Sequence, residues 1–187
     1  MQFLRIVMSY FRKHQTAPVR FFHITVLILV IFQIISSNFM GFTSRGEIKT
    51  NLVDFYGAWT HIITGLSLLP VAFAFIYIEI KTHGFNYFFK YLSGDFSQVK
   101  KDISVMKQRQ LPEANPNSIA SIVQGLGLGA LTLVLLSGCA WFVSWIYDVP
   151  WVKISKEIHQ SLTGLIQAYV VAHGFMGLLH IYMATKK

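Results

Sequence analysis

Four long stretches of the chain contain no charged residue and are mostly apolar: residues 21–44, 55–78, 115–147 and 158–185. A helix needs about 20 such residues to cross the hydrocarbon of a bilayer, and each stretch is long enough. Backbone N–H and C=O groups find no partners in lipid, so spanning segments of this kind must be helical. The pattern therefore predicts an all-α, integral membrane four-helix bundle. Its helices should cover about residues 21–42, 55–79, 118–146 and 158–184.

The polar segments outside these stretches predict no further domain. The opening segment, MQFLRIVMSYFRKH, is amphipathic and should lie along the membrane surface. The first apolar stretch is not expected to be a cleavable signal, because its apolar core is too long and no small-residue cleavage site follows it. The link at residues 80–117 has weak helical periodicity over residues 96–110 and ends in an LPEANPN turn. Residues 1–187 should thus form a single transmembrane domain.

Composition agrees with a multi-pass membrane protein, because 53% of the 187 residues are hydrophobic and only 13% are charged. Twelve of the sixteen Lys and Arg residues lie in the N-terminal segment, the 80–117 link and the C-terminus. The positive-inside rule places both termini in the cytoplasm of a bacterial inner membrane protein. The net charge of +8 then reflects topology and attraction to anionic membrane lipid, and no nucleic-acid binding. With one cysteine and no CxxCH motif, covalently attached c-type heme is excluded.

Four of the histidines inside the apolar stretches, where an ionisable ring is costly and usually functional, are placed to form two pairs: His23, His61, His159 and His173. His159 and His173 are 14 residues apart. That spacing is about 21 Å along a helix and about 40° around it, so one face of the fourth helix carries both rings. Depth in the membrane then pairs His61 with His159 near the outer face, and His23 with His173 near the inner face. Imidazole is a common axial ligand of heme iron, so the two pairs predict two bis-His hemes inside the bundle.

Each of these residues also suits a role that needs no heme. A single histidine in a transmembrane helix can bridge two helices or lie among the headgroups, and a zinc site would need carboxylate or thiolate ligands that are missing at this depth. His180, two turns after His173 on the same face, is the alternative inner ligand. Gly65, one turn after His61, leaves room for a porphyrin but also suits close helix packing. Arg20 is placed to meet a heme propionate, although membrane topology and snorkelling account for it as well.

Short motifs resemble the bacterial cytochrome b561 family. They are RFFH at the start of the first predicted helix, HIITG in the second, and the spacing of the two histidines in the fourth. The wider group includes the membrane cytochrome b subunits of nickel–iron hydrogenase, formate dehydrogenase and thiosulfate reductase, and the resemblance covers all four helices. It implies heme b, two per chain, with iron ligands at His23, His61, His159 and His173. It also implies quinone chemistry at the membrane.

The turn before the third predicted helix carries a further part of the resemblance. Asn115 and Pro116 match the start of the family's N-P-x-Q stretch near the inner heme, which implies that Asn115 contacts a quinone. Ser118 stands where the family often has glutamine. Asn115 also suits the role of a turn or helix-cap residue, which needs no ligand.

Three functions are compatible with these features. The first is an electron-transfer subunit of a respiratory oxidoreductase, which passes electrons between quinone and a periplasmic oxidoreductase or cytochrome subunit. The second is an autonomous superoxide:quinone oxidoreductase, in which basic residues steer the anion to the outer heme. Those residues would be Arg45, Lys49, Lys153 and Lys156. The third is a heme-free membrane scaffold. The short outer loops and the lack of a catalytic domain favour the first.

Overall fold

The structure, a computed structural model, describes every residue except 1, 45, 109, 111, 113–114 and 185–187. In the described part of the chain, four helices are long and apolar enough to cross a membrane, so the predicted all-α, four-helix membrane bundle is confirmed. The elements in chain order are α1 (Gln2–His14), α2 (Ala17–Ser36), the 3₁₀ turn η1 (Ser37–Phe39), α3 (Leu52–His83), α4 (Phe85–Phe89), the 3₁₀ turn η2 (Lys90–Ser93), α5 (Ser97–Lys107), α6 (Ile119–Ile146) and α7 (Val152–Ala184).

Four of the predicted helix ends fall short of those in the structure. Helix α2 begins at Ala17, α3 runs from Leu52 to His83, and α7 begins at Val152 rather than near residue 158. A charged residue at the end of a spanning helix lies at the level of the headgroups, where its long side chain reaches water. The helix therefore continues past the last apolar residue, and the uncharged stretch marks only the part inside the hydrocarbon.

The predicted end of the first helix, at residue 42, is wrong in the opposite direction. Helix α2 ends at Ser36, and η1 adds a single tight turn to Phe39. The following residues form a compact loop instead, in which the Thr43 N–H donates to the carbonyl of Glu47 (2.8 Å). Apolar composition alone could not locate this turn.

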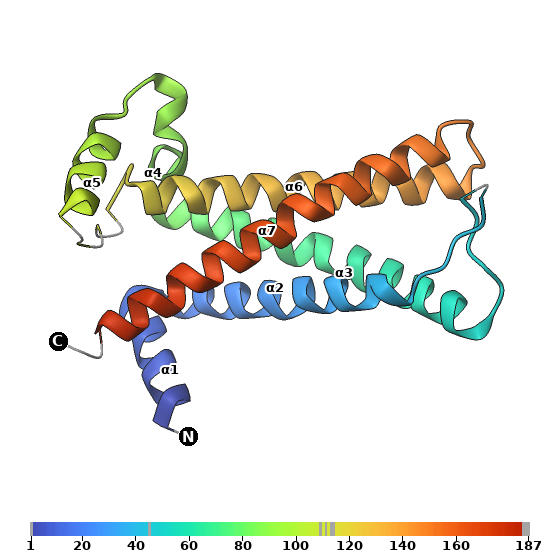
Figure 1. Ribbon diagram of the computed structural model, residues 1–187, viewed down its shortest axis with the longest axis horizontal. Coiled ribbons are helices and arrows are strands. Elements are labelled where there is room, and N and C mark those ends of the chain that lie inside the picture. The colour runs from blue at the N-terminus through green and yellow to red at the C-terminus, as the bar shows by residue number, and fades with distance from the viewer. Residues whose placement is uncertain (1, 45, 109, 111, 113–114, 185–187) are drawn as a thin grey trace.

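The four spanning helices run along the long axis of the molecule (Figure 1). Helices α2 and α3 form one antiparallel pair, α6 and α7 form another, and α7 crosses diagonally toward the start of α2. The described parts of two connections, residues 40–44 with 46–51 and residues 147–151, lie at one end, which we call the loop end. Helices α1, α4 and α5 and the last turn of α7 lie at the other, which we call the terminal end.

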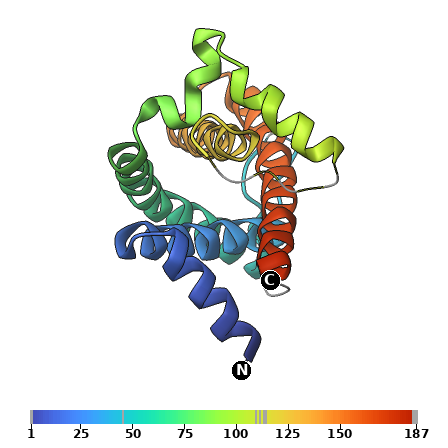
Figure 2. The same cartoon turned by 90° about the vertical axis from the view of Figure 1, so that its left-hand side faces the viewer.

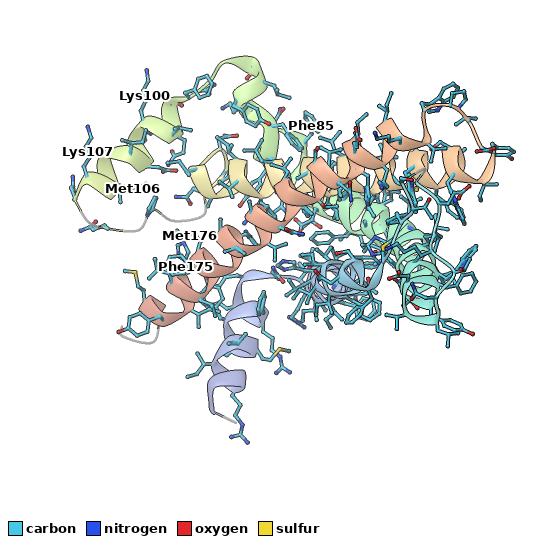
Figure 3. All side chains as sticks on the ribbon, turned by 45° about the vertical axis from the view of Figure 1, so that its right-hand side comes forward. Phe85, Lys100, Met106, Lys107, Phe175 and Met176 are labelled. Carbon is cyan, nitrogen blue, oxygen red and sulfur yellow. The ribbon has the colours of Figure 1, made fainter. Side chains whose placement is uncertain are left out.

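The core lies where the two pairs meet, and it contains Val26, Leu68, Leu131 and Ile166, one from each spanning helix. Burial is uneven between the helices: 33% of the most apolar window of α6 is buried, but only 6% of that of α7. Helix α7 therefore lies at the edge of the bundle. Its exposed apolar residues include Phe175 and Met176, which Figure 3 labels, and in a bilayer they would face lipid.

The link between α3 and α6 folds over the start of α6. Phe88 of α4 is only 1% exposed, and it packs so close to Gly125 that a Cβ there would lie 2.9 Å from the Cβ of Phe88. Asp102 of α5 is 2% exposed, and its carboxylate accepts from the backbone N–H of Ile119 (2.7 Å) and from Gln98 Nε2 (2.9 Å). A buried carboxylate at a helix N-terminus satisfies an otherwise unpaired donor and favours the helix dipole. Helix α5, which lies inside the weakly periodic segment, thus caps α6.

The outer surface of this link carries basic residues beside exposed apolar ones such as Leu92 and Met106. Lys100 and Lys107 of α5 point away from the bundle (Figure 3). The Lys90 ammonium donates to the carboxylate of Asp95 (2.8 Å), and this bond holds the pKa of that carboxyl below its usual range. Lys100 and Lys107 are exposed and can meet anionic headgroups at the terminal end.

Helix α1 extends away from the bundle axis at the terminal end (Figures 1 and 2). It contacts α2 and α7, and its basic residues Arg5, Arg12 and Lys13 are exposed. This orientation suits an amphipathic helix in the plane of the membrane surface, as its sequence indicates.

Candidate functional site

The structure brings the four intramembrane histidines together in two pairs. His61 of α3 and His159 of α7 have ring centroids 6.5 Å apart, with 71° between the ring planes. His23 of α2 and His173 of α7 have ring centroids 6.1 Å apart, with 60° between the planes. These are the pairs that depth along the helices selects. Helix α7 contributes one ring to each pair, so the first pair lies toward the loop end and the second toward the terminal end.

The spacing within each pair fits a single metal ion between two imidazoles. Two metal–nitrogen bonds of about 2 Å, each extended by about 1 Å from nitrogen to ring centre, put the centroids about 6 Å apart. Among the described residues, no group of three or more His, Cys, Asp and Glu side chains could hold a metal ion. Each pair thus supplies two ligands, which is what an iron porphyrin takes from a protein when both of its axial positions are filled.

Hydrogen bonds orient both rings of the loop-end pair. Ser36 Oγ lies 3.1 Å from His61 Nδ1, and Ser137 Oγ lies 3.0 Å from His159 Nδ1. Each hydroxyl also donates its one proton to a carbonyl of its own helix, that of Gln33 for Ser36 and of Val134 for Ser137. Each serine oxygen therefore accepts from an Nδ1–H. The free lone pair of both imidazoles is then on Nε2, the atom that a metal would need.

A cavity surrounds the loop-end pair and extends between α2, α3, α6 and α7. It measures about 770 Å³, including its open mouth, and both His61 and His159 line it. Gly138 allows the close approach of α6 to the pair, because a Cβ there would lie 3.0 Å from Cε1 of His159. Gly65, which the sequence indicates as a source of space, also lines the cavity. Apolar side chains with a few polar groups line this cavity, a lining that is typical of ligand sites in proteins.

One buried polar group of this cavity has no hydrogen-bond partner in the described part of the protein. Trp141 lines the cavity and is only 4% exposed, and its indole N–H has no partner among the described residues. Lys156 Nζ lies 4.6 Å from the centre of the Phe42 ring, which in turn meets the ring of Trp141 edge to face. A buried unpaired donor in a cavity indicates an acceptor that belongs there.

Aromatic rings, rather than serines, flank the terminal-end pair. The ring of Phe75 stacks on that of His23 at 5.7 Å, and the ring of Tyr169 stacks on that of His173 at 5.1 Å. Tyr169 lies against the backbone of Gly127, where a side chain would overlap its ring. The pair therefore sits in a largely apolar setting, which favours electron-transfer chemistry over exchange with water.

The ring contacts of His23 identify its partner on α7. The His23 ring contacts the rings of Phe11, Phe75 and His173. Its histidine partner is therefore His173 and not His180. His180 lies two turns further along α7 and is half-buried. The geometry favours His173 as the inner ligand.

Arg20 and Asn115 take local roles in the structure. Arg20 is half-buried and its Nη1 donates to the backbone carbonyl of Gln15 (3.4 Å), next to His23 in the chain fold. Asn115 is exposed, and its carbonyl accepts from the N–H of Ser118 (3.1 Å). Its quinone contact stays a prediction, and the bond itself shows the turn role. Arg45, a candidate for steering anions, lies outside the described residues.

Three partners of the histidines, Gln15, Ser36 and Ser137, were missed by sequence reasoning. A serine in a spanning helix often bonds to a carbonyl of its own helix, and both serines do so, which makes their sequence signal ambiguous. Gln15 lies before the first apolar stretch, and nothing in the sequence around it indicates a contact with a histidine.

Fold and site together define a transmembrane protein with two pairs of inward-facing histidines, one toward each end of a four-helix bundle. The sequence matches the family model described as prokaryotic cytochrome b561 over residues 14–186. The chain belongs to that family, and membership implies a bacterial membrane b-type cytochrome that binds heme b and takes part in electron transfer. No curated protein and no solved structure matches the chain.

Proposed function

We propose that the protein is a diheme b-type cytochrome of the bacterial inner membrane, which passes electrons between the quinone pool and a periplasmic redox partner. The observation that carries this proposal is the presence of two close imidazole pairs that share α7. One heme would lie between His61 and His159, and the other between His23 and His173. The 14 residues between the two α7 ligands span about 21 Å, most of the hydrocarbon thickness.

The protein's own residues set the properties of each site. When bound, the two hemes would supply one-electron redox centres at two depths in the membrane. Two histidines at each site leave no open coordination position, which favours electron transfer over binding of oxygen. The serines at the loop end hold Nδ1–H and so present Nε2 to the centre of the site. Apolar side chains around both pairs exclude water.

The groups placed for heme propionates differ between the two ends. At the loop end, the unpaired indole N–H of Trp141 and the nearby Lys156 ammonium are suited to anionic oxygens. At the terminal end, Arg20 already bonds to a carbonyl beside the His23 pair and has further N–H donors. Both ends thus offer a cation or donor where a carboxylate would leave the apolar bundle.

The charge distribution supports the direction of insertion. The terminal end carries the exposed basic residues of α1 and α5, so we place it in the cytoplasm. The loop end then faces the periplasm, and its short connections leave the bundle accessible to a docked redox protein. The Asn115 turn lies at the start of α6, beside the terminal end, where the family resemblance puts quinone chemistry.

A quinol-reduction experiment tests this function. The full-length chain, purified in detergent with its hemes oxidised, is mixed with a short-chain quinol, and heme absorbance is followed by stopped flow. We expect both hemes to become reduced, and we expect the His173→Ala variant to slow reduction of the remaining heme at least about tenfold, because the terminal-end site is lost. Hemes that quinol leaves oxidised, but that superoxide reduces rapidly, would instead identify the superoxide:quinone reaction.

A further inference from the structure

Gln15 connects α1 to the terminal-end histidine pair. It follows α1 directly, and its side-chain amide lies 2.9 Å from Nδ1 of His23. Phe11, one turn earlier, places its ring edge-on to the His23 ring at 5.9 Å. The end of α1 and the residue after it therefore both contact the His23 ring.

The backbone of Gln15 is held in place from both sides. Its N–H donates to the carbonyl of Phe11 (2.9 Å), and its carbonyl accepts from Nη1 of Arg20 (3.4 Å). These bonds join the last turn of α1 to the first turn of α2. The amide is thus presented to His23 by a fixed backbone, which is the condition for a positioning role.

The hydrogen-bonding capacity of the amide identifies the role. An imidazole whose Nε2 binds iron carries its proton on Nδ1 and needs an acceptor there. Gln15 Oε1 is buried and has no partner among the described residues. Rotating the Gln15 side-chain amide by 180° places its oxygen where its nitrogen was, and its nitrogen where its oxygen was. Only the hydrogen-bond partners tell these two orientations apart. When Oε1 of Gln15 faces His23, it accepts the Nδ1–H of His23, so both the ring N–H and the amide oxygen have a partner. The amide nitrogen then takes the buried position that the oxygen leaves, where a propionate of the proposed heme would be its acceptor.

We propose that Gln15 is a positioning residue for His23: its amide oxygen accepts the Nδ1–H, and α1 thereby helps to set the reduction potential of the terminal-end heme. The inference rests on the proposed function. The loop-end pair has serine hydroxyls in this place, both from spanning helices. Gln15 comes from the surface helix instead. An acceptor on Nδ1–H makes the imidazole a more basic ligand, which stabilises oxidised iron and lowers the potential.

Potentiometric titration of the full-length chain with both hemes bound tests the proposal. In Gln15→Leu the acceptor is gone, and we expect the terminal-end heme to favour the reduced state by up to about tenfold, or about 59 mV for one electron. In Gln15→Glu the acceptor is stronger, so the shift should have the opposite sign. The loop-end heme should keep its potential in both variants. The two hemes are told apart by the His173→Ala variant, which retains only the loop-end heme.

Two controls separate positioning from general damage. Gln108→Leu changes an exposed glutamine and should leave both potentials unchanged, whereas Ser137→Ala should shift only the loop-end heme. If Gln15→Leu loses the terminal-end heme while Gln15→Glu retains it, the acceptor role is still supported. Unchanged potentials, a shift of the loop-end heme, or loss of heme from both Gln15 variants would overturn the inference. A wild-type chain without heme would overturn the proposed function itself.

Discussion

The two histidine pairs are built in different ways, although α7 contributes to both. At the loop end, the rings are oriented by Ser36 and Ser137, which belong to spanning helices, and the cavity is enclosed by four helices. At the terminal end, the amide beside His23 comes from the segment after α1, and aromatic rings stack on both histidines. The loop-end site is thus a product of helix packing alone. The terminal-end site depends also on a helix that does not span the membrane.

Filling the loop-end cavity with a larger side chain should give the largest difference in heme binding between the two sites. A Cβ on Gly138 would lie 3.0 Å from the His159 ring, so the side chain in Gly138→Leu must occupy the space beside that ring. We expect loss of the loop-end heme with retention of the other, measured as heme per chain in the purified protein. The matched control is Gly164→Leu on α7, since nothing lies within 4 Å of a Cβ at Gly164. Retention of both hemes in Gly138→Leu would contradict this placement of the site.

The buried carboxylate of the link should matter for stability at the terminal end. Asp102→Asn replaces one accepting oxygen with a donor, so either the Ile119 N–H or the Gln98 amide loses its partner. A buried donor left unpaired costs about 1–3 kcal/mol, which should appear as a lower free energy of unfolding in detergent. Asp148→Asn, an exposed change in the loop-end turn with φ of 46°, is the control and should be near neutral because Asn tolerates that conformation. Equal stability of the two variants would show that Asp102 does not hold the link.

The smallest expected effect concerns His180. The ring beside His23 is that of His173, so His180→Ala should leave the number of hemes and their spectra unchanged. The measurement is the reduced-minus-oxidised spectrum of the variant beside that of the wild type. Loss of the terminal-end heme in this variant would transfer iron ligation from His173 to His180.

The helices and the pairing of histidines followed from the sequence because both depend on distance along a helix. The charge-free stretches predicted the spanning helices. The spacing of 14 residues from His159 to His173 predicted that both rings lie on the same face of the fourth helix. The start of α7 at Val152 did not follow, because Lys153, Lys156 and Glu157 end the apolar stretch while the helix continues.

The hydrogen-bond partners of the histidines were beyond the reach of the sequence. Whether Ser36 or Ser137 meets a histidine depends on the rotation of its helix about its own axis, which apolar composition does not specify. The same limit applies to Asp102, which looks like any charged residue of a polar link but is 2% exposed under the start of α6. Gln15 lies outside every apolar stretch, and only the path of α1 brings it to His23.

Heme content of single histidine variants tests the two-site arrangement most directly. Full-length wild type and the variants His23→Ala, His61→Ala, His159→Ala and His173→Ala are expressed with a heme supply, and heme b per chain is measured together with the redox titration of what remains. Two hemes are expected in the wild type, with the same one lost when His61 or His159 is replaced and the other lost when His23 or His173 is replaced. A folded wild-type chain without heme, or different hemes lost from the His61 and His159 variants, would contradict the account.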